Sequence, residues 1–169
     1  MIDARAILGH KRLSLLDLSE AGAQPMSDPS GRYTIVYNGE VYNFRQLGAA
    51  LTREAGVVFA SGSDTEVLLH HLIRHVAEPA RALREWEGMF AFALYDRLEQ
   101  TLFLARDRFG IKPLYYACRP DAFWFASEMK APLSNSHYGR RPPKGGTPTA
   151  RKSPFTALVY RLQPVFETV

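Results

Sequence analysis

Gly88-Met89-Phe90-Ala91-Phe92-Ala93-Leu94-Tyr95 is the stretch at which the pattern of the sequence changes, and it decides the fold class. From Met89 to Tyr95 the residues are apolar and include several aromatic rings, which predicts a strand. Three further strands are predicted after it, joined by short polar connections that contain turn-forming Asp and Gly. They cover Thr101–Arg106, Pro113–Ala117 and Phe123–Ala126. The region after Gly88 is therefore predicted to form a run of antiparallel strands.

The residues before Gly88 predict one strand and then helices. Arg32–Tyr37 is rich in β-branched and aromatic residues, so it predicts a buried strand. Asn38-Gly39 follows it directly and is a strong turn signal. Helices are predicted over Phe44–Glu54, from Thr65 to about Val76, and over Pro79–Glu85. This order of elements favours an α+β fold with helices layered on an antiparallel sheet.

Capping residues stand at the ends of the predicted helices. Asn43 can cap the first helix and Gly56 ends it, while Ser63 and Glu66 have the spacing of a capping box at the second. The second helix is also predicted to carry a set of apolar residues on its inward face. These are Leu68, Leu69, Leu72, Ile73 and Val76.

Size and composition indicate one globular domain. The chain has 169 residues, of which 46% are hydrophobic and 22% are charged. The sequence contains no apolar run of membrane-spanning length and no signal-peptide pattern. The single cysteine, Cys118, excludes an internal disulfide and any multi-cysteine metal site. A cytoplasmic protein is the simplest expectation.

Charge is unevenly distributed between two parts of the chain. Residues 1–133 hold 15 Lys/Arg against 16 Asp/Glu, a net charge of −1, whereas residues 134–169 hold 6 against 1, a net charge of +5. The second part is also dense in Pro and Gly, which predicts a disordered basic tail after a domain that ends at 133. Because the predicted domain has no evident basic face, we expect no nucleic-acid partner.

Seven segments between Gly9 and Leu133 together resemble the class II glutamine amidotransferase (glutaminase) domain of the glutamine-hydrolysing asparagine synthetases. They are GHKRLS (9–14), QPM (24–26), YNGEVYN (37–43), SDTEV (63–67), GMFAFA (88–93), ARDRFGIKPLYY (105–116) and FASEMK (125–130). The resemblance implies an N-terminal-nucleophile hydrolase fold, a layered sandwich of antiparallel sheets and helices. It also implies glutamine hydrolysis that supplies ammonia for making asparagine from aspartate and ATP.

The resemblance assigns a role to Asn38 and Gly39 as the oxyanion hole. An amide side chain and a backbone N–H aimed at one point stabilise the oxygen of a tetrahedral intermediate. Glycine lets the backbone approach a ligand closely. By the residues alone, Asn38-Gly39 would instead be an ordinary hairpin turn.

The resemblance also implies which residues hold glutamine. Arg12 matches the arginine that pairs with the α-carboxylate through two hydrogen bonds. Glu40 and Asp64 match the residues that receive the α-amino group, since a cationic ammonium needs carboxylate or carbonyl acceptors. The implied substrate-binding residues next to Arg12 are Leu13, Ser14, Leu15 and Leu16. Asn38 and Gly39 complete the substrate-binding set.

Two other groups of residues are interpreted as structural. The segment with Arg106-Asp107 and Lys112 is predicted to form a tight turn at Phe109-Gly110 held by local charges. His71 and His75 are spaced i, i+4, but the remaining residues of a zinc-hydrolase motif are absent, so no metal site is predicted.

The sequence departs from the family at its nucleophile. Family members attack glutamine with a cysteine that is the first residue of the mature chain, whereas this sequence begins Met1-Ile2-Asp3 and has only Cys118. Cys118 has no motif around it and is expected to be a small, partly buried apolar residue. We therefore expect a domain that is incomplete at both ends and inactive by itself.

Several functions stay open at this point. The chain is a glutaminase domain that works with a synthetase domain or subunit, a catalytically dead module that binds glutamine or serves as a scaffold, or a non-functional truncation product. The glutaminase domain itself is expected to need no cofactor and no metal. ATP and magnesium are implied only for the synthetase domain, and glutamine is the expected ligand.

Overall fold

A computed structural model gives the structure of residues 6–10, 22–118 and 122–128, together with the backbone of residues 156–161. Its main element is an antiparallel sheet with the strand order β1-β2-β3-β4-β7. The strands of this sheet are β1 (Met26–Ser27), β2 (Tyr33–Val41), β3 (Gly88–Asp96), β4 (Thr101–Arg106) and β7 (Thr156–Arg161).

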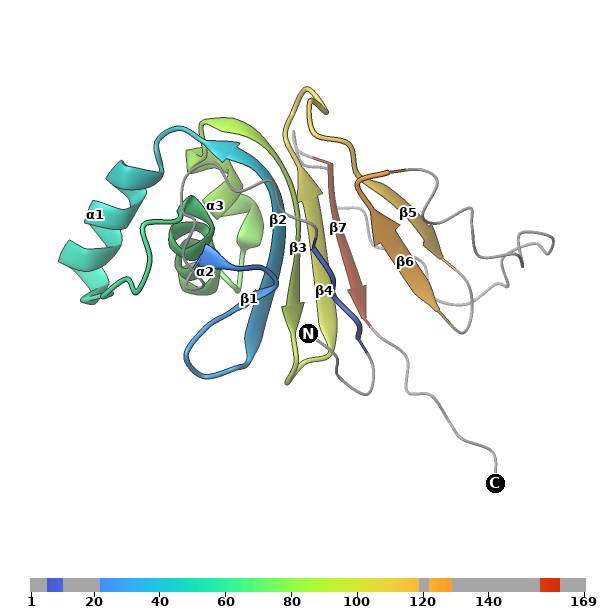
Figure 1. The fold of residues 1–169 in the computed structure, drawn as a ribbon, viewed down its shortest axis with the longest axis horizontal. Helices are drawn as coiled ribbons and strands as arrows, with labels where there is room; N and C mark the ends of the chain where they lie inside the picture. The colour runs from blue at the N-terminus through green and yellow to red at the C-terminus, as the bar shows by residue number, and fades with distance from the viewer. Residues whose placement is uncertain (1–5, 11–21, 119–121, 129–155, 162–169) are drawn as a thin grey trace.

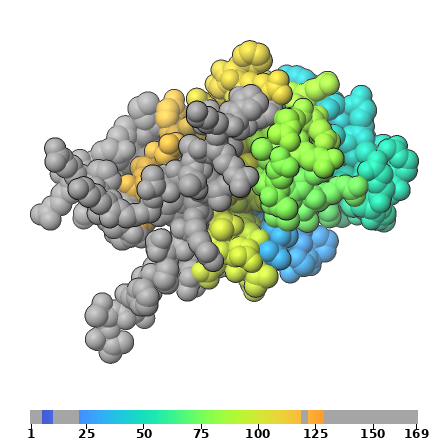
Figure 2. Space-filling model, turned by 180° about the vertical axis from the view of Figure 1, so that it is seen from behind, coloured from blue at the N-terminus to red at the C-terminus, as the bar shows by residue number. Residues whose placement is uncertain are grey.

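Three layers are stacked in the molecule (Figure 1). Helices α1 (Phe44–Ala55), α2 (Asp64–Arg74) and α3 (Pro79–Glu85) cover one face of the main sheet. A second sheet of two strands, β5 (Tyr115–Cys118) and β6 (Phe123–Ala126), lies over the other face. From behind, α1 and the two-stranded sheet lie on opposite sides of the molecule (Figure 2). The predicted α+β class, with helices layered on antiparallel sheet, is confirmed.

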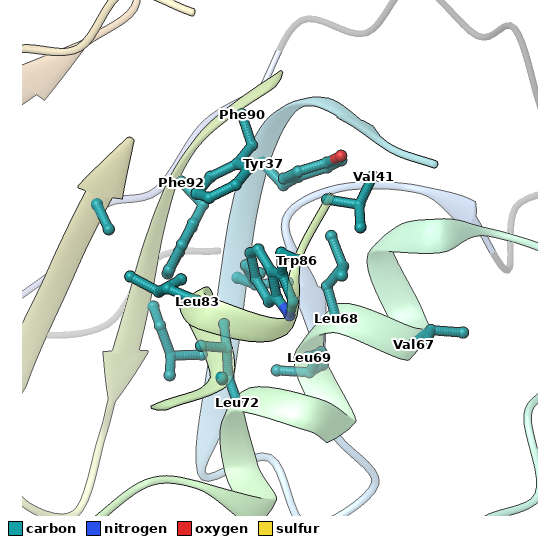
Figure 3. Packing of buried hydrophobic residues seen from close by; sticks show 14 of the residues in the cluster. Tyr37, Val41, Val67, Leu68, Leu69, Leu72, Leu83, Trp86, Phe90 and Phe92 are labelled. Atoms are coloured by element: carbon teal, nitrogen blue, oxygen red, sulfur yellow. The ribbon is translucent and has the colours of Figure 1, made fainter. Parts of the chain in front are cut away.

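The larger hydrophobic core fills the space between the helices and the main sheet (Figure 3). Leu68, Leu69 and Leu72 of α2 pack there against Phe90 and Phe92 of β3. A smaller core on the other face of the sheet contains Val36, Ala93, Tyr95, Leu102 and Leu104, with Phe123 and Phe125 of β6 packed against it. The main sheet is therefore buried on both faces, which accounts for the continuous apolar run of β3.

The apolar face predicted for α2 is correct except at its end. Leu68, Leu69 and Leu72 are buried and Ile73 is partly buried against the core. Val76 is 42% exposed because α2 ends at Arg74, so Val76 lies beyond the last turn of the helix.

The predicted helix caps are partly confirmed. Gly56 ends α1 in the left-handed conformation, and the Ser63 hydroxyl accepts from Thr65 N–H at the start of α2. The Asn43 side chain makes no cap hydrogen bond. It joins the start of α1 to the end of α3, donating to Glu85 O at 2.8 Å and accepting from Glu87 N at 3.1 Å.

The turn predicted at Asn38-Gly39 is wrong. Both residues lie inside β2, where Asn38 pairs with Ala91 and Gly39 pairs with Phe90. The local turn signal is overridden because nine residues of β2 pair continuously with β3. The chain bends only after Val41, where α1 begins within three residues.

Strand β7 departs from the expectation of a disordered tail over residues 134–169. Its backbone pairs with the free edge of β4, with Thr101 opposite Arg161 and Arg106 opposite Thr156. The other residues of this basic segment are outside the described part, so a domain boundary at residue 133 stays a prediction.

Candidate functional site

A cavity of about 550 Å³ lies at the open edge of β2, between the start of α2 and the two-stranded sheet. Strand β2 contributes Tyr37, Asn38, Gly39 and Glu40 to its wall, and α2 contributes Asp64. The sequence-predicted residues of β2 and α2 are therefore brought to one cavity, although 24 positions separate Glu40 from Asp64 in the chain.

The open edge of β2 results from the shortness of β1. Strand β1 pairs only with Thr34 and Ile35, so among the residues that the structure describes the rest of β2 has a strand partner on one side alone. The N–H of Tyr37 points to the open side, where it donates to the side-chain oxygen of Gln24 at 2.6 Å. Because alternate residues of a strand direct their N–H groups to the same side, the N–H of Gly39 also points to the open edge.

Glycine is required at position 39 by the close approach of β3. A Cβ on Gly39 would lie 2.7 Å from the Cα of Phe90 and would collide with the carbonyl oxygen of Met89. Gly88 has the reciprocal constraint, because its Cβ would lie 2.8 Å from the Cα of Val41. These two glycines allow β2 and β3 to come together where β2 carries Asn38 and Glu40 along the cavity.

Asp64 is a buried carboxylate aimed at this cavity from the first residue of α2. The Tyr37 hydroxyl donates to Asp64 Oδ2 at 3.0 Å. Burial raises the pKa of Asp64, while hydrogen bonds from Tyr37 and from the backbone of Val41 and Thr65 oppose that rise and Glu40 adds to it. The pKa of Tyr37 is raised by burial and then by Asp64, so its hydroxyl stays protonated and remains a donor.

Glu40 and Asp64 give the cavity two carboxylates that act on each other. Glu40 is half-buried at the end of β2, and its charge contributes to the raised pKa of Asp64. Two carboxylates held near one another repel, and a cation between them relieves that repulsion. This part of the cavity therefore suits an ammonium group.

Gln24 joins the two elements that carry the predicted site residues. Its side-chain oxygen accepts from Tyr37 N–H of β2, and its Nε2 donates to Thr65 Oγ1 of α2 at 3.3 Å. The spacing between the edge of β2 and the start of α2 is thus fixed by side-chain hydrogen bonds. The sequence offered Gln24 only as part of a matching segment, and no local pattern indicated that it joins these elements.

The loop after β4 forms another wall of the cavity through Lys112, Pro113 and Leu114. Asp107 organises this loop: its carboxylate accepts from the backbone N–H groups of Phe109, Ile111 and Lys112 at 3.0–3.1 Å. It also accepts from Phe90 N–H at 3.2 Å, which ties the loop to β3. The predicted turn at Phe109-Gly110 is present, and one local charge, the Asp107 carboxylate, holds it by accepting from backbone amides.

The remaining predicted site residues and the cysteine are not among the described residues that line the cavity. Arg12, together with Leu13, Ser14, Leu15 and Leu16, lies outside the described residues. Cys118 is half-buried at the end of β5, as expected for a structural residue, and is not among the described residues that line the cavity.

His71, His75 and Glu85 place possible ligand atoms within 4.8 Å of one another on the helical side of the molecule. Trp86 Nε1 donates to His71 Nδ1 at 3.1 Å, so the ring proton of neutral His71 sits on Nε2, 3.2 Å from Glu85 Oε2. Both ring nitrogens are then used in hydrogen bonds. Burial lowers the pKa of His71 against the opposing effect of Glu85, which fits a structural link between α2 and α3.

The geometry of the cavity suits a small polar ligand that carries both an amine and a carbonyl group. The N–H of Gly39 and the amide of Asn38 offer donors to an oxygen, and Asp64 and Glu40 offer acceptors to an ammonium. None of the described helices is long and apolar enough to cross a membrane.

Comparison with known proteins gives a consistent result. The family model "Glutamine amidotransferase domain" matches residues 1–144. Asparagine synthetase [glutamine-hydrolyzing] 3 of Bacillus subtilis is 44% identical over 131 residues, which cover 76% of this chain and 20% of that protein. A putative asparagine synthetase of Methanocaldococcus jannaschii is 38% identical over 141 residues, covering 75% of this chain and 26% of that protein.

A solved structure extends the similarity to the fold. Glutamine phosphoribosylpyrophosphate amidotransferase of B. subtilis aligns with a TM-score of 0.60 and 29% identity, over 72% of this chain and 27% of that one. The expected N-terminal-nucleophile hydrolase-like fold is thereby confirmed. The chain spans about a fifth of the length of the B. subtilis asparagine synthetases that it matches. This chain belongs to the glutamine amidotransferase domain family, in the class II group that includes the glutamine-hydrolysing asparagine synthetases.

Proposed function

We propose that the cavity at the edge of β2 binds L-glutamine, and that the chain is the glutaminase domain of an enzyme of the asparagine synthetase type. The observation that carries this proposal is the meeting of Asn38, Gly39 and Glu40 of β2 with Asp64 of α2 around one cavity. These residues offer acceptors to an amine at one position and donors to a carboxamide oxygen at another. Glutamine carries both groups on one short chain.

In the proposed complex each end of glutamine has its own partners. The α-ammonium lies between Asp64 and Glu40, and the α-carboxylate pairs with Arg12. The carboxamide oxygen accepts from Gly39 N–H and the Asn38 side chain, which also stabilise the negative oxygen after attack on the carbonyl carbon. Losing one such donor typically costs about 2.7–4 kcal/mol in the transition state.

The proposed reaction in the parent enzyme releases ammonia from glutamine and passes it to an activated aspartate in a synthetase domain or subunit. ATP and magnesium act in that synthetase partner. The glutaminase step itself needs no cofactor, since protein groups can supply the nucleophile, the oxyanion hole and the base that takes its proton and delivers one to the leaving ammonia. A cytoplasmic location belongs to the same proposal, because a chain with one cysteine forms no internal disulfide.

A second candidate function is glutamine binding without hydrolysis by the 169-residue polypeptide. Cys118, its single cysteine, lies at the end of β5 and not among the described cavity residues. Orientation and oxyanion stabilisation assist a bond-breaking step only when a nucleophile attacks the carbonyl carbon. In the family that nucleophile is a cysteine, and the position of Cys118 outside the described cavity residues supports this second candidate.

Titration calorimetry tests the proposed binding. L-Glutamine should bind with one site per chain, and N-acetyl-L-glutamine should bind at least about tenfold more weakly, because acetylation removes the cation that Asp64 and Glu40 would receive. Equal affinity for the two ligands, or no binding of L-glutamine, would contradict the proposal.

Ammonia release from glutamine separates the two candidate functions. We expect no turnover by the purified polypeptide, and no change on Cys118→Ala. Turnover at about one per second, which is within the common range for enzymes, would exclude binding without hydrolysis. If Cys118→Ala abolished that turnover, Cys118 would be the nucleophile.

A further inference from the structure

Tyr37 differs from the other aromatic residues of the larger core because its polar end reaches the cavity. Its ring packs in the core with Phe90 and Phe92, and Figure 3 shows its hydroxyl at the Val41 end of the cluster. The residue is only 4% exposed, and the hydroxyl donates to Asp64 Oδ2 at 3.0 Å. A phenylalanine would supply the same ring without this hydrogen bond.

Tyr37 is also fixed through its backbone. Its N–H donates to the Gln24 side chain, which in turn donates to Thr65 next to Asp64. Tyr37 is therefore joined to the start of α2 twice, through Gln24 to Thr65 and directly to Asp64. Because one oxygen of Asp64 is held by Tyr37, the carboxylate has a single defined orientation when a ligand arrives.

We propose that Tyr37 is a positioning residue for substrate binding, which holds the Asp64 carboxylate in the orientation that receives the α-ammonium of glutamine. This inference rests on the proposed function of the cavity. Tyr37 acts through Asp64 and makes no contact of its own with the ligand in this account.

The hydrogen bond from Tyr37 also favours the ionised form of Asp64, the form that an ammonium requires. Several other ionisable groups face or line the same cavity. They are Glu40 of β2, His10, Lys112 of the loop after β4, and Glu128 after β6. Only Glu40 among them contributes noticeably to the raised pKa of Asp64, so among the described residues Tyr37 is the main side-chain group that opposes the effect of burial.

A double-mutant cycle tests whether Tyr37 acts through Asp64. Tyr37→Phe should weaken L-glutamine binding by about three- to tenfold, the size expected for one hydrogen bond to a charged group. Asp64→Asn should weaken it by more. In the Asp64→Asn background, the further effect of Tyr37→Phe should fall below about twofold, because the carboxylate through which Tyr37 acts is gone.

Tyr33→Phe is the matched control. Tyr33 is buried on the same face of β2, but its hydroxyl is near Asp96 at the other end of the strand and it does not line the cavity. This variant should keep the glutamine affinity of the wild type. An equal loss of affinity in Tyr33→Phe and Tyr37→Phe would mean that general loosening of the core is responsible, and it would overturn the inference.

A second measurement needs no ligand. The side-chain carboxyl carbon of Asp64, followed by NMR across pH, reports its ionisation directly. The pH at the midpoint of the Asp64 titration should rise in Tyr37→Phe, because the hydrogen bond that favours the charged carboxylate is lost. It should not change in Tyr33→Phe. An unchanged midpoint in Tyr37→Phe would overturn the inference.

The outcomes also separate this inference from the proposed function. If Asp64→Asn abolishes glutamine binding while Tyr37→Phe has no effect, the cavity binds glutamine and Tyr37 does not position Asp64. If wild-type protein binds no glutamine, the proposed function fails and this inference fails with it.

Discussion

Asp107→Ala is expected to destabilise the domain more than any exposed charge substitution. The carboxylate is buried and accepts from four backbone amides, at 3.0 Å from Phe109 and Ile111, 3.1 Å from Lys112 and 3.2 Å from Phe90. Burial by itself would raise the pKa of Asp107, but these four amides together lower it. The charged form is therefore the one that the folded state favours.

The size of the loss follows from where each amide lies. Phe90 is fully buried in β3, so its N–H has no access to water when the carboxylate is removed, at a cost of about 1–3 kcal/mol. Phe109 is 89% exposed and Ile111 is 58% exposed, so the loop amides can turn to water and cost roughly 0.5–1 kcal/mol each. With three loop amides and the Phe90 amide, we expect a total of about 2.5–6 kcal/mol for Asp107→Ala and about half of that for Asp107→Asn.

Urea unfolding followed by circular dichroism measures this loss. Glu54→Ala is the control, because Glu54 makes only exposed ion pairs with Arg53 and Arg74 and should cost less than about 1 kcal/mol. Since the folded pKa of Asp107 is lowered, its contribution is present above the unfolded pKa of about 3.9 and is lost as the pH falls further. A loss below about 1 kcal/mol at pH 7 for Asp107→Ala would refute this reasoning.

Three further predictions follow from the glycines and from His71. Gly39→Ala should lower the free energy of unfolding by about 1–3 kcal/mol and abolish glutamine binding, because the added Cβ meets the backbone of β3. The control is Gly62→Ala, which has open space around it and should change neither the stability measured by unfolding nor the affinity measured by calorimetry. Gly48→Ala should stabilise α1 by about 0.5–1 kcal/mol in urea unfolding, since its Cβ would make ordinary contact with Val67. The lowered pKa of His71, caused mainly by burial, predicts that stability falls as the pH drops below about 6.5. His71→Gln should remove that pH dependence and His70→Gln should keep it. If the free energy of unfolding depended on pH equally in the two variants, His71 would not be the group responsible.

The local sequence pattern predicted most helices and strands, because most of them show the spacing of apolar residues that is typical of their type. The helix over Pro79–Glu85 and the strands over Thr101–Arg106 and Phe123–Ala126 have the bounds that the sequence predicts. The failures occur where partners distant in sequence decide the structure. Asn38 and Gly39 continue β2 because β3 pairs with them, and the backbone at Thr156–Arg161 forms a strand because β4 offers a free edge.

The sequence likewise indicated part of the candidate site, and the part it did not indicate depends on contacts between residues distant in the sequence. Resemblance to the family indicated Asn38, Gly39, Glu40 and Asp64, and the structure brings them to one cavity. It could not indicate the roles of Gln24 and Tyr37. These depend on hydrogen bonds across 13 and 27 positions of the sequence, which only the packed fold brings together.

A crystal structure of the protein with L-glutamine shows at once whether the cavity at the edge of β2 is the glutamine site. We expect the carboxamide oxygen within about 2.7–3.1 Å of Gly39 N and the Asn38 side chain, with the ammonium between Asp64 and Glu40. Glutamine bound elsewhere, or bound in this cavity with its ammonium away from both carboxylates, would contradict this expectation.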